Sequence, residues 1–334
     1  QAIIVNSGNA NTCNEDGELV AETMCVLVEK YTGVPRADVI VASTGVIGQP
    51  LDILPVAEGM ESLAEGLGTN NDADNEAIMT TDTVKKQAAV EFTLGGKKCA
   101  VGAMAKGSGM IHPNMATMLV FVTTDVDISP EMLQKAVSED VKTSFNMITV
   151  DGDTSTNDML CAMASGLAGN EKITEENEDY FTFAAALNAV TVKLCRMIAK
   201  DGEGATKLLE CNVSGAKTRE DAVKAAKSVV GSALFKAAMF GADANWGRVL
   251  CAVGYSGADT DVNKIGVSFS SKAGKITVCK AGSGVPFSEE KAKTILGEDE
   301  IEINVTLCDG DCSATAWGCD LTYDYVKING DYRT

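Results

Sequence analysis

The stretch that decides the fold is Lys106–Asp125, which reads Lys-Gly-Ser-Gly-Met-Ile-His-Pro-Asn-Met-Ala-Thr-Met-Leu-Val-Phe-Val-Thr-Thr-Asp. Its glycines and proline predict a loop over residues 106–116, and the apolar run Met118–Val122 predicts a buried strand. Thr117 lies where the loop enters the strand. The strand would hold its backbone rigidly, and the loop would leave its hydroxyl accessible. Threonine is favoured in strands anyway, so an ordinary β-branched residue at a strand start is the alternative.

Apolar periodicity predicts strands and helices on both sides of this segment. We expect strands at residues 2–5, 39–42, 88–94, 97–103, 249–253, 265–269, 275–278, 301–307 and 321–328. We expect helices at residues 16–31, 174–200 and 218–238, and another from the Ser129 cap to about residue 143. The elements follow no regular βαβ count, which favours a layered α/β or α+β fold over a simple Rossmann sheet.

The chain has 334 residues, a length that suggests about two domains, and a formal net charge of −19. An acidic surface repels phosphate groups, so we expect neither a nucleic-acid partner nor a membrane partner. We find no apolar stretch of the roughly 18 residues that a membrane-spanning helix needs, and we expect a cytoplasmic protein. The chain begins with Gln1, which predicts that the natural start lies upstream and leaves a targeting peptide open.

The 11 cysteines are scattered and odd in number, which is typical of free thiols in a reducing compartment. The one cluster is Cys308, Cys312 and Cys319. A zinc site usually has C-x-x-C spacing or nearby histidines, so we expect structural thiols and no bound metal. A non-catalytic metal-binding protein that uses these thiols is the alternative from a different functional class.

The sequence contains a single histidine, His112. A nucleophilic enzyme built from this chain is therefore expected to use a base other than imidazole, such as a lysine, a carboxylate or an N-terminal amine. There is no P-loop and no dinucleotide-binding motif, and we expect no cofactor. Two calcium-like loops begin at Asp151 and Asp309, but Thr156 and Ala314 stand where such loops need glycine.

Several segments carry recognisable motifs in order along the whole chain: Asn6–Asn11, Ser43–Gly48, Met79–Thr83, Lys106–Thr117, Asp151–Asp158, Asp201–Lys207, Gly241–Arg248 and Tyr325–Thr334. Together they resemble the glutamate N-acetyltransferase (ornithine acetyltransferase) family of arginine biosynthesis, whose members carry a longer stretch before the first motif. In that family the chain cuts itself, and a threonine becomes the N-terminal nucleophile of the second subunit. The resemblance implies a cut between Ala116 and Thr117, giving an α chain of residues 1–116 and a β chain that begins at Thr117.

The resemblance also implies the roles of single residues. Thr117 is the expected nucleophile, and Thr44 and Gly45 are the expected oxyanion hole. The expected substrate contacts are Thr80, Lys106, Thr117, Glu203, Asn329 and Thr334. The implied reaction moves the acetyl group of N-acetylornithine to glutamate through an acetyl-Thr117 intermediate, with the freed α-amine as the base. Acetyl-CoA stays open as a second donor, and an amidase or aminopeptidase of the same self-cleaving class is the alternative.

The fold implied by the resemblance is a layered αββα sandwich with a smaller C-terminal α/β domain. We place the catalytic core at residues 1–206 and the smaller domain at residues 207–334, with a tail that returns to the active site. The expected partners are the two small-molecule substrates. The α and β chains are expected to assemble further as α2β2.

Overall fold

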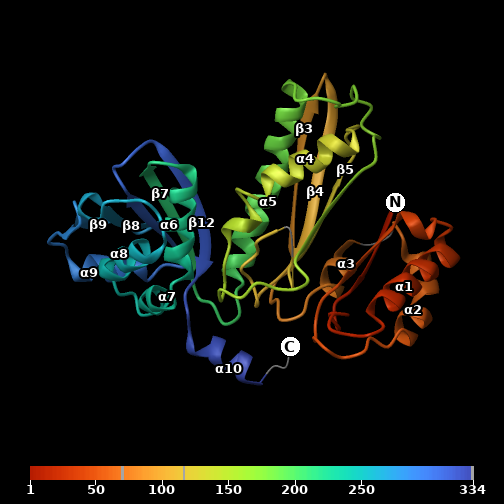
Figure 1. Ribbon diagram of the computed structural model, residues 1–334, viewed down its shortest axis with the longest axis horizontal. Helices are drawn as coiled ribbons and strands as arrows, with labels where there is room; N and C mark the ends of the chain where they lie inside the picture. The colour runs from red at the N-terminus through yellow and green to blue at the C-terminus, as the bar shows by residue number, and fades with distance from the viewer. Residues whose placement is uncertain (69–70, 116, 332–334) are drawn as a thin grey trace.

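The computed structural model describes residues 1–68, 71–115 and 117–331. Two short parallel strands, β1 (Ala2–Asn6) and β2 (Val39–Ser43), open the chain. The helices α1 (Gly17–Thr32) and α2 (Leu54–Gly66) cover one face of this pair (Figure 1). Apolar side chains alternate along the strands because successive residues point to opposite faces. Ile4 therefore packs against these helices, and Ile3 and Val5 point the other way.

The second sheet has the strand order β3-β4-β5-β6. Its strands are β3 (Lys86–Leu94), β4 (Lys97–Lys106), β5 (Leu119–Thr124) and β6 (Met159–Ala164). Leu119 and Phe121 of β5 pack against the inner face of the β1-β2 pair, whereas Val120 and Val122 point to the main core. The two sheets thus lie face to face.

Helices cover the far side of the second sheet. They are α4 (Pro130–Asp140), which begins at the Ser129 cap, and α5 (Glu178–Lys200). Together with α1 and α2 they complete an α-β-β-α order of layers, which confirms the expected layered α/β fold. A short helix, α3 (Asn71–Ala77), and the 3-10 turns Arg36–Asp38 and Phe145–Met147 lie in the connections.

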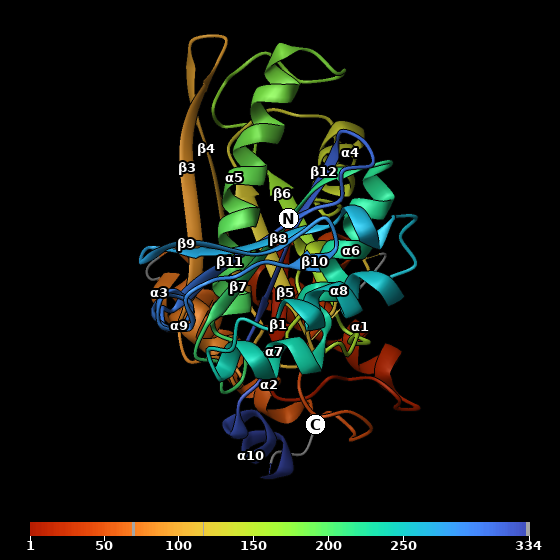
Figure 2. The same cartoon turned by 90° about the vertical axis from the view of Figure 1, so that its left-hand side faces the viewer.

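A third sheet follows, with the strand order β10-β9-β8-β11-β7-β12. Its strands are β7 (Leu208–Ala216), β8 (Gly266–Ser271), β9 (Gly274–Lys280), β10 (Ser283–Gly284), β11 (Glu300–Thr306) and β12 (Cys312–Cys319). The helices around it are α6 (Arg219–Gly231), α7 (Ala233–Phe240), α8 (Trp246–Tyr255) and α9 (Glu289–Leu296), and a 3-10 turn spans Val262–Lys264. In Figure 2 its strands run across the direction of β3 and β4.

Helix α5 joins the two parts of the molecule. It contacts β3 and β4 on one side and β7 and β12 on the other, and one apolar core runs through both parts. The third sheet begins at Leu208, beside the boundary expected at residue 206, and the division into two domains stays a prediction. By length and composition α5 could cross a membrane, with 23 residues and an 18-residue window whose mean hydropathy is 1.4, contrary to our expectation of no such stretch. Its place between two sheets is that of a core helix.

Three expected elements differ from the structure. Val249–Val253 belongs to helix α8, because a short buried apolar run fits a helix as well as a strand and the Asn245 side chain caps this one. The helix expected over residues 218–238 breaks at Ser232, whose extended backbone and side chain cap α7 instead. Residues 321–328 were expected as a strand but lie largely in helix α10 (Tyr323–Asp331), where the Thr322 hydroxyl accepts the Tyr325 N–H at 3.4 Å.

We predict that Leu194→Ala lowers the free energy of unfolding by about 2–5 kcal/mol, because the side chain leaves a cavity in a close-packed core. Leu194 lies on α5 and is 0% exposed. Leu167→Ala is the matched control, since Leu167 is 85% exposed, and we expect it to change stability little. Urea denaturation measures both. Equal effects would show that α5 is not a core helix.

Candidate active site

Two loops meet where the parallel strands β1 and β2 end. The Thr44 N–H donates to the Asn6 carbonyl at 2.9 Å, which continues the strand pairing into the loops. Gly45 has a φ of +130°, and a Cβ atom there would lie 2.4 Å from the carbonyl carbon of Gly8. Only glycine allows this close approach, so Gly45 fixes how the two loops pass each other.

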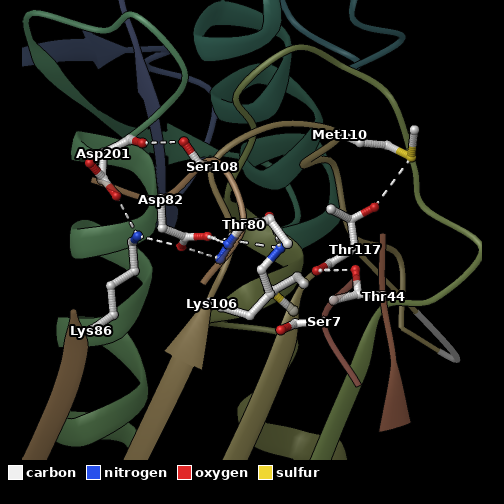
Figure 3. Close-up of polar contacts among 12 residues, drawn as sticks. Ser7, Thr44, Thr80, Asp82, Lys86, Lys106, Ser108, Met110, Thr117 and Asp201 are labelled. Carbon is white, nitrogen blue, oxygen red and sulfur yellow. Dashed lines mark hydrogen bonds and ion pairs between the residues drawn. The ribbon is translucent and has the colours of Figure 1, made fainter. Parts of the chain in front are cut away.

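Thr117 lies beside these loops, shortly before β5 (Figure 3). Its hydroxyl donates to the Ser155 Oγ at 2.7 Å and lies 3.3 Å from the Met110 sulfur. Its backbone N–H donates to Asp158 Oδ1 at 3.1 Å. The Thr44 hydroxyl donates to the carbonyl oxygen of Thr117 at 3.1 Å. The hydroxyl of Thr117 is therefore held by other polar groups at the edge of the sheet.

A buried group of charges lies next to Thr117. Lys86 Nζ contacts Asp82 Oδ1 at 2.7 Å and Asp201 Oδ2 at 2.5 Å. Lys106 Nζ lies 3.9 Å from the other oxygen of Asp82 and donates to the Thr80 hydroxyl at 2.8 Å. Both lysines are 1% exposed. Figure 3 shows the chain of contacts from Asp201 through Lys86 and Asp82 to Lys106.

Burial and charge act in opposite directions on the pKa values of this group. Burial alone would raise the pKa of Asp82, but the lysine charges of Lys86 and Lys106 and the Gly107 N–H hold it below its usual value. Burial lowers the pKa of Lys106, and the Asp82 carboxylate opposes that shift. Asp82 thus stays ionised and supports the charge of a lysine that has almost no contact with water.

The C-terminal helix α10 lies over the other side of the site. It packs directly on Gly204, where a Cβ atom would lie 2.6 Å from the Tyr325 nitrogen. Asn329 on this helix donates to Glu203 Oε2 at 2.7 Å. A Cβ atom at Gly109 would lie 2.4 Å from the Glu203 carboxylate, so the loop before Thr117 also touches this glutamate. Glu203 is 8% exposed and is held between the two segments.

These segments enclose a cavity of about 190 Å³. Its lining residues are Thr44, Gly45, Thr80, Thr81, Gly109, Met110, Thr117, Asp151, Asp153, Glu203, Tyr325 and Asn329. Of the residues expected from the sequence, six line it, and Lys106 reaches it through Thr80. The structure therefore brings together residues that lie up to 285 positions apart, between Thr44 and Asn329. Ala116 and Thr334 lie outside the described residues.

Sequence reasoning gave no role to several residues of the site. Asp151 and Ser155 lie in a segment that we singled out as a motif, and Tyr325 lies in another. Asp151 accepts the Met110 N–H at 2.6 Å and the Ile111 N–H at 3.0 Å, which shapes the loop before Thr117. The motif indicated that this segment belongs to the site. It did not indicate which of its side chains face Thr117, because that depends on the folded structure.

The other candidate sites have fewer features of a catalytic or metal-binding site. Among the described residues, no group of three or more His, Cys, Asp and Glu side chains could hold a metal ion, and Cys308, Cys312 and Cys319 are free thiols. His112 hydrogen-bonds to Thr149 at 3.0 Å, and burial lowers its pKa. A larger cavity of about 930 Å³ lies on the outer side of Gly204. Its lining includes Thr83, whose hydroxyl donates to Asp201, but Asp201 is also paired with the buried Lys86. The smaller cavity is the one lined by six of the expected site residues, so size does not decide between the two cavities.

The chain is similar to known proteins over its whole length. Residues 1–334 match the ArgJ family model. The chain is 54% identical to the arginine biosynthesis bifunctional protein ArgJ 1 of Clostridium acetobutylicum, covering 100% of this chain and 82% of the relative. It is 53% identical to the arginine biosynthesis bifunctional protein ArgJ of Symbiobacterium thermophilum, covering 100% of this chain and 83% of the relative. A crystal structure of ArgJ from Bacillus halodurans is 49% identical with a TM-score of 0.61, covering 64% of this chain and 98% of that one.

We predict that Gly45→Ala destabilises the protein more than Gly48→Ala. Both glycines have positive φ, and a side chain there costs about 1–3 kcal/mol in backbone strain. Only at Gly45 would the new methyl group also meet backbone atoms, whereas nothing lies within 4 Å at Gly48. Urea denaturation of the two variants measures the difference. Equal losses would mean that the loops meet differently in solution.

Proposed function

We infer the function from the premise that this chain belongs to the ArgJ family: it is an acyltransferase of arginine biosynthesis that moves the acetyl group of N-acetylornithine to glutamate. The observation that carries this inference is the small cavity that Thr117 lines together with the Thr44 loop and Glu203. A cavity of about 190 Å³ suits small substrates. Both substrates are amino acids with a carboxylate and an amino or acylamino group.

Thr117 is the proposed nucleophile, made active by a cut between Ala116 and Thr117. The cut frees an α-amine whose reference pKa is about 7.7–8.0, so the nucleophile brings its own base near neutral pH. A base of this kind explains how Thr117 could react although His112, the single histidine, does not line its cavity. The similarity to the ArgJ crystal structure supports the cut. Nearly all of that solved chain matches 64% of this one, and residues 117–334 make up about that share.

The charged side chains are proposed to recognise the two ends of the amino-acid substrate. Lys106 and the Thr80 hydroxyl would bind a carboxylate, and Asp82 keeps the lysine in place. Glu203 would bind an ammonium group, assisted by the Asn329 amide. We assign Thr334 to the same function by resemblance alone, because it lies outside the described residues.

The Thr44 hydroxyl and the Gly45 N–H are proposed to stabilise the oxyanion of the tetrahedral intermediate. Each such donor is worth roughly 3 kcal/mol in comparable sites. The Thr44 hydroxyl already lies 3.1 Å from the carbonyl oxygen of Thr117, next to the residue whose Oγ1 would attack, and the oxyanion would form on the acetyl carbonyl oxygen of the substrate. Ornithine then leaves, and glutamate takes the acetyl group from Thr117.

Three further properties complete the proposal. The relatives are named bifunctional proteins, which supports acetyl-CoA as a second acetyl donor. The two chains made by the cut are proposed to assemble as α2β2 in the cytoplasm. The self-cleaving amidase or aminopeptidase is the less favoured alternative, because Glu203 lines the cavity of Thr117 and Lys106 lies behind the lining residue Thr80, which gives two opposite charges suited to an amino acid.

We predict that purified protein consists of two fragments that meet at Ala116 and Thr117, and that Thr117→Ala remains a single chain. Denaturing mass spectrometry measures both. Incubation with N-acetylornithine should add one acetyl group to the fragment that begins at Thr117, and glutamate should remove it. Thr117→Ser is the control that keeps a hydroxyl and should still be cut. Water removing the acetyl group as fast as glutamate would favour the hydrolase.

The pKa of Lys106 gives a prediction for the alkaline side of the pH profile. Burial lowers this pKa below 10.5, so the ammonium is lost at a lower pH than for an exposed lysine. The KM for glutamate should therefore rise as pH increases through the lowered pKa. In Lys106→Arg the charge persists over this range, so this rise in KM should be absent. Identical pH profiles would rule out Lys106 as the carboxylate contact.

A further inference from the structure

A threonine that supplies both the nucleophile and the base faces a geometric difficulty. The Oγ1 and the nitrogen of Thr117 sit on neighbouring carbons of the same residue. A direct proton transfer between them closes a strained small ring, in which the O–H···N angle is far from straight, and hydrogen bonds weaken steeply below about 120°. A group that contacts both atoms from outside would remove this difficulty.

Ser155 is such a group. Its Oγ accepts the Thr117 hydroxyl proton at 2.7 Å and also accepts the Thr117 N–H. Its position is fixed, because its Oγ also accepts the Asn157 N–H at 3.0 Å. The Asn157 side chain in turn donates to the carbonyls of Ala10 and Ser43, each at 2.8 Å, and so ties this turn to the loops of β1 and β2.

Asp158 fixes the other atom of the pair. Its Oδ1 accepts the N–H groups of Thr117 and Met118 at 3.1 and 3.0 Å. Its Oδ2 is buried and has no hydrogen-bond partner among the described residues. A buried acceptor without a donor is unfavourable. Cleavage before Thr117 turns one amide N–H into an amine with additional hydrogens, which provides a donor next to this oxygen.

We propose that Ser155 is a further catalytic residue, which relays the proton from the Thr117 hydroxyl to the Thr117 α-amine, and that Asp158 positions that amine. This inference rests on the proposed function. In the acylation step, Thr117 Oγ1 gives its proton to Ser155 Oγ, and Ser155 gives its own proton to the lone pair of the amine. The bond from Oγ1 to the acetyl carbon forms, and the carbonyl electron pair moves to the oxyanion.

The relay runs in reverse when the intermediate collapses. The ammonium returns a proton through Ser155 towards the departing amine of ornithine, and the carbonyl re-forms as the carbon–nitrogen bond breaks. Ser155 ends unchanged, and the ornithine amine leaves protonated or neutral according to the solution pH. The same path serves the second half of the exchange, in which the amine of glutamate attacks the acetyl ester.

The test measures the wild-type protein first and then compares it with matched variants. Single-turnover acetylation by N-acetylornithine is followed in mixtures of H₂O and D₂O, for cut wild-type protein and for Ser155→Ala and Ser155→Thr. Thr156→Ala is the control: it removes the neighbouring hydroxyl, which donates to the Asn157 side chain at 2.6 Å. Mass spectrometry verifies cleavage, and thermal unfolding verifies the fold of each protein.

In wild type we expect a curved dependence of rate on deuterium content, because two protons move in the step. A linear dependence would overturn the relay without any variant. Ser155→Ala should lose roughly 10²-fold in rate with little change in KM and should become linear, since general acid–base groups contribute at least about that factor. Ser155→Thr should recover most of the rate, and Thr156→Ala should match wild type.

A cut, folded Ser155→Ala protein with the wild-type rate would also overturn the proposal. If this variant stays uncut or unfolds, the wild-type measurement decides alone. Failure of the proposed function looks different, because then the wild type forms no acetyl-Thr117 at all. A wild type that transfers acetyl with one proton in motion keeps the function and removes only the role of Ser155.

Discussion

The register of three neighbouring strands is the constraint on which the site depends. Lys106, the last residue of β4, pairs with Leu119 at the start of β5, and Leu119 pairs with Met159 at the start of β6. The residues just before β5 and β6 and the last residue of β4 therefore meet at one edge of the sheet. A slip of one residue would turn every side chain of a strand to the opposite face. Apolar side chains on both faces of β5 prevent that slip, because both faces are buried.

The face-to-face packing of the two sheets supplies the other half of the site. Since β1 and β2 are parallel, their loops leave at the same end, and the layer contact places that end over the start of β5. The buried charges stabilise this junction from one side. Lys86 joins Asp82, which follows α3, to Asp201, which follows α5, so an ion pair with almost no exposure to water links distant segments. Removal of one partner from such a group leaves an uncompensated buried charge, which is strongly destabilising.

The sequence was most informative where local signals agree. The glycine-rich loop before Thr117, the alternating runs at residues 88–94 and 97–103 and the Ser129 cap each predicted an element that is present. The strands predicted at residues 249–253 and 321–328 were wrong, because short apolar runs have no distinct period. The caps at Asn245 and Thr322 decided in favour of a helix at both places. The positions of site residues rest on resemblance, since nothing local relates Thr44 to Asn329. The contacts of Ser155 and Asp158 with Thr117 were beyond prediction, because they depend on the register between β5 and β6.

The hydrogen-bonded pairing of β4 with β5 has a consequence for how the two chains would persist in a cell. The loop that contains the expected cut joins two antiparallel neighbours in the middle of a sheet, paired from Val101–Thr124 to Lys106–Leu119. Once cut, the pieces would share that sheet and the apolar layers on both of its faces. They would be made in equal amounts, would never have to find each other, and would be recovered together by a tag on either one. Subunit stoichiometry would thus be inherited from a single translation product and would need no separate control.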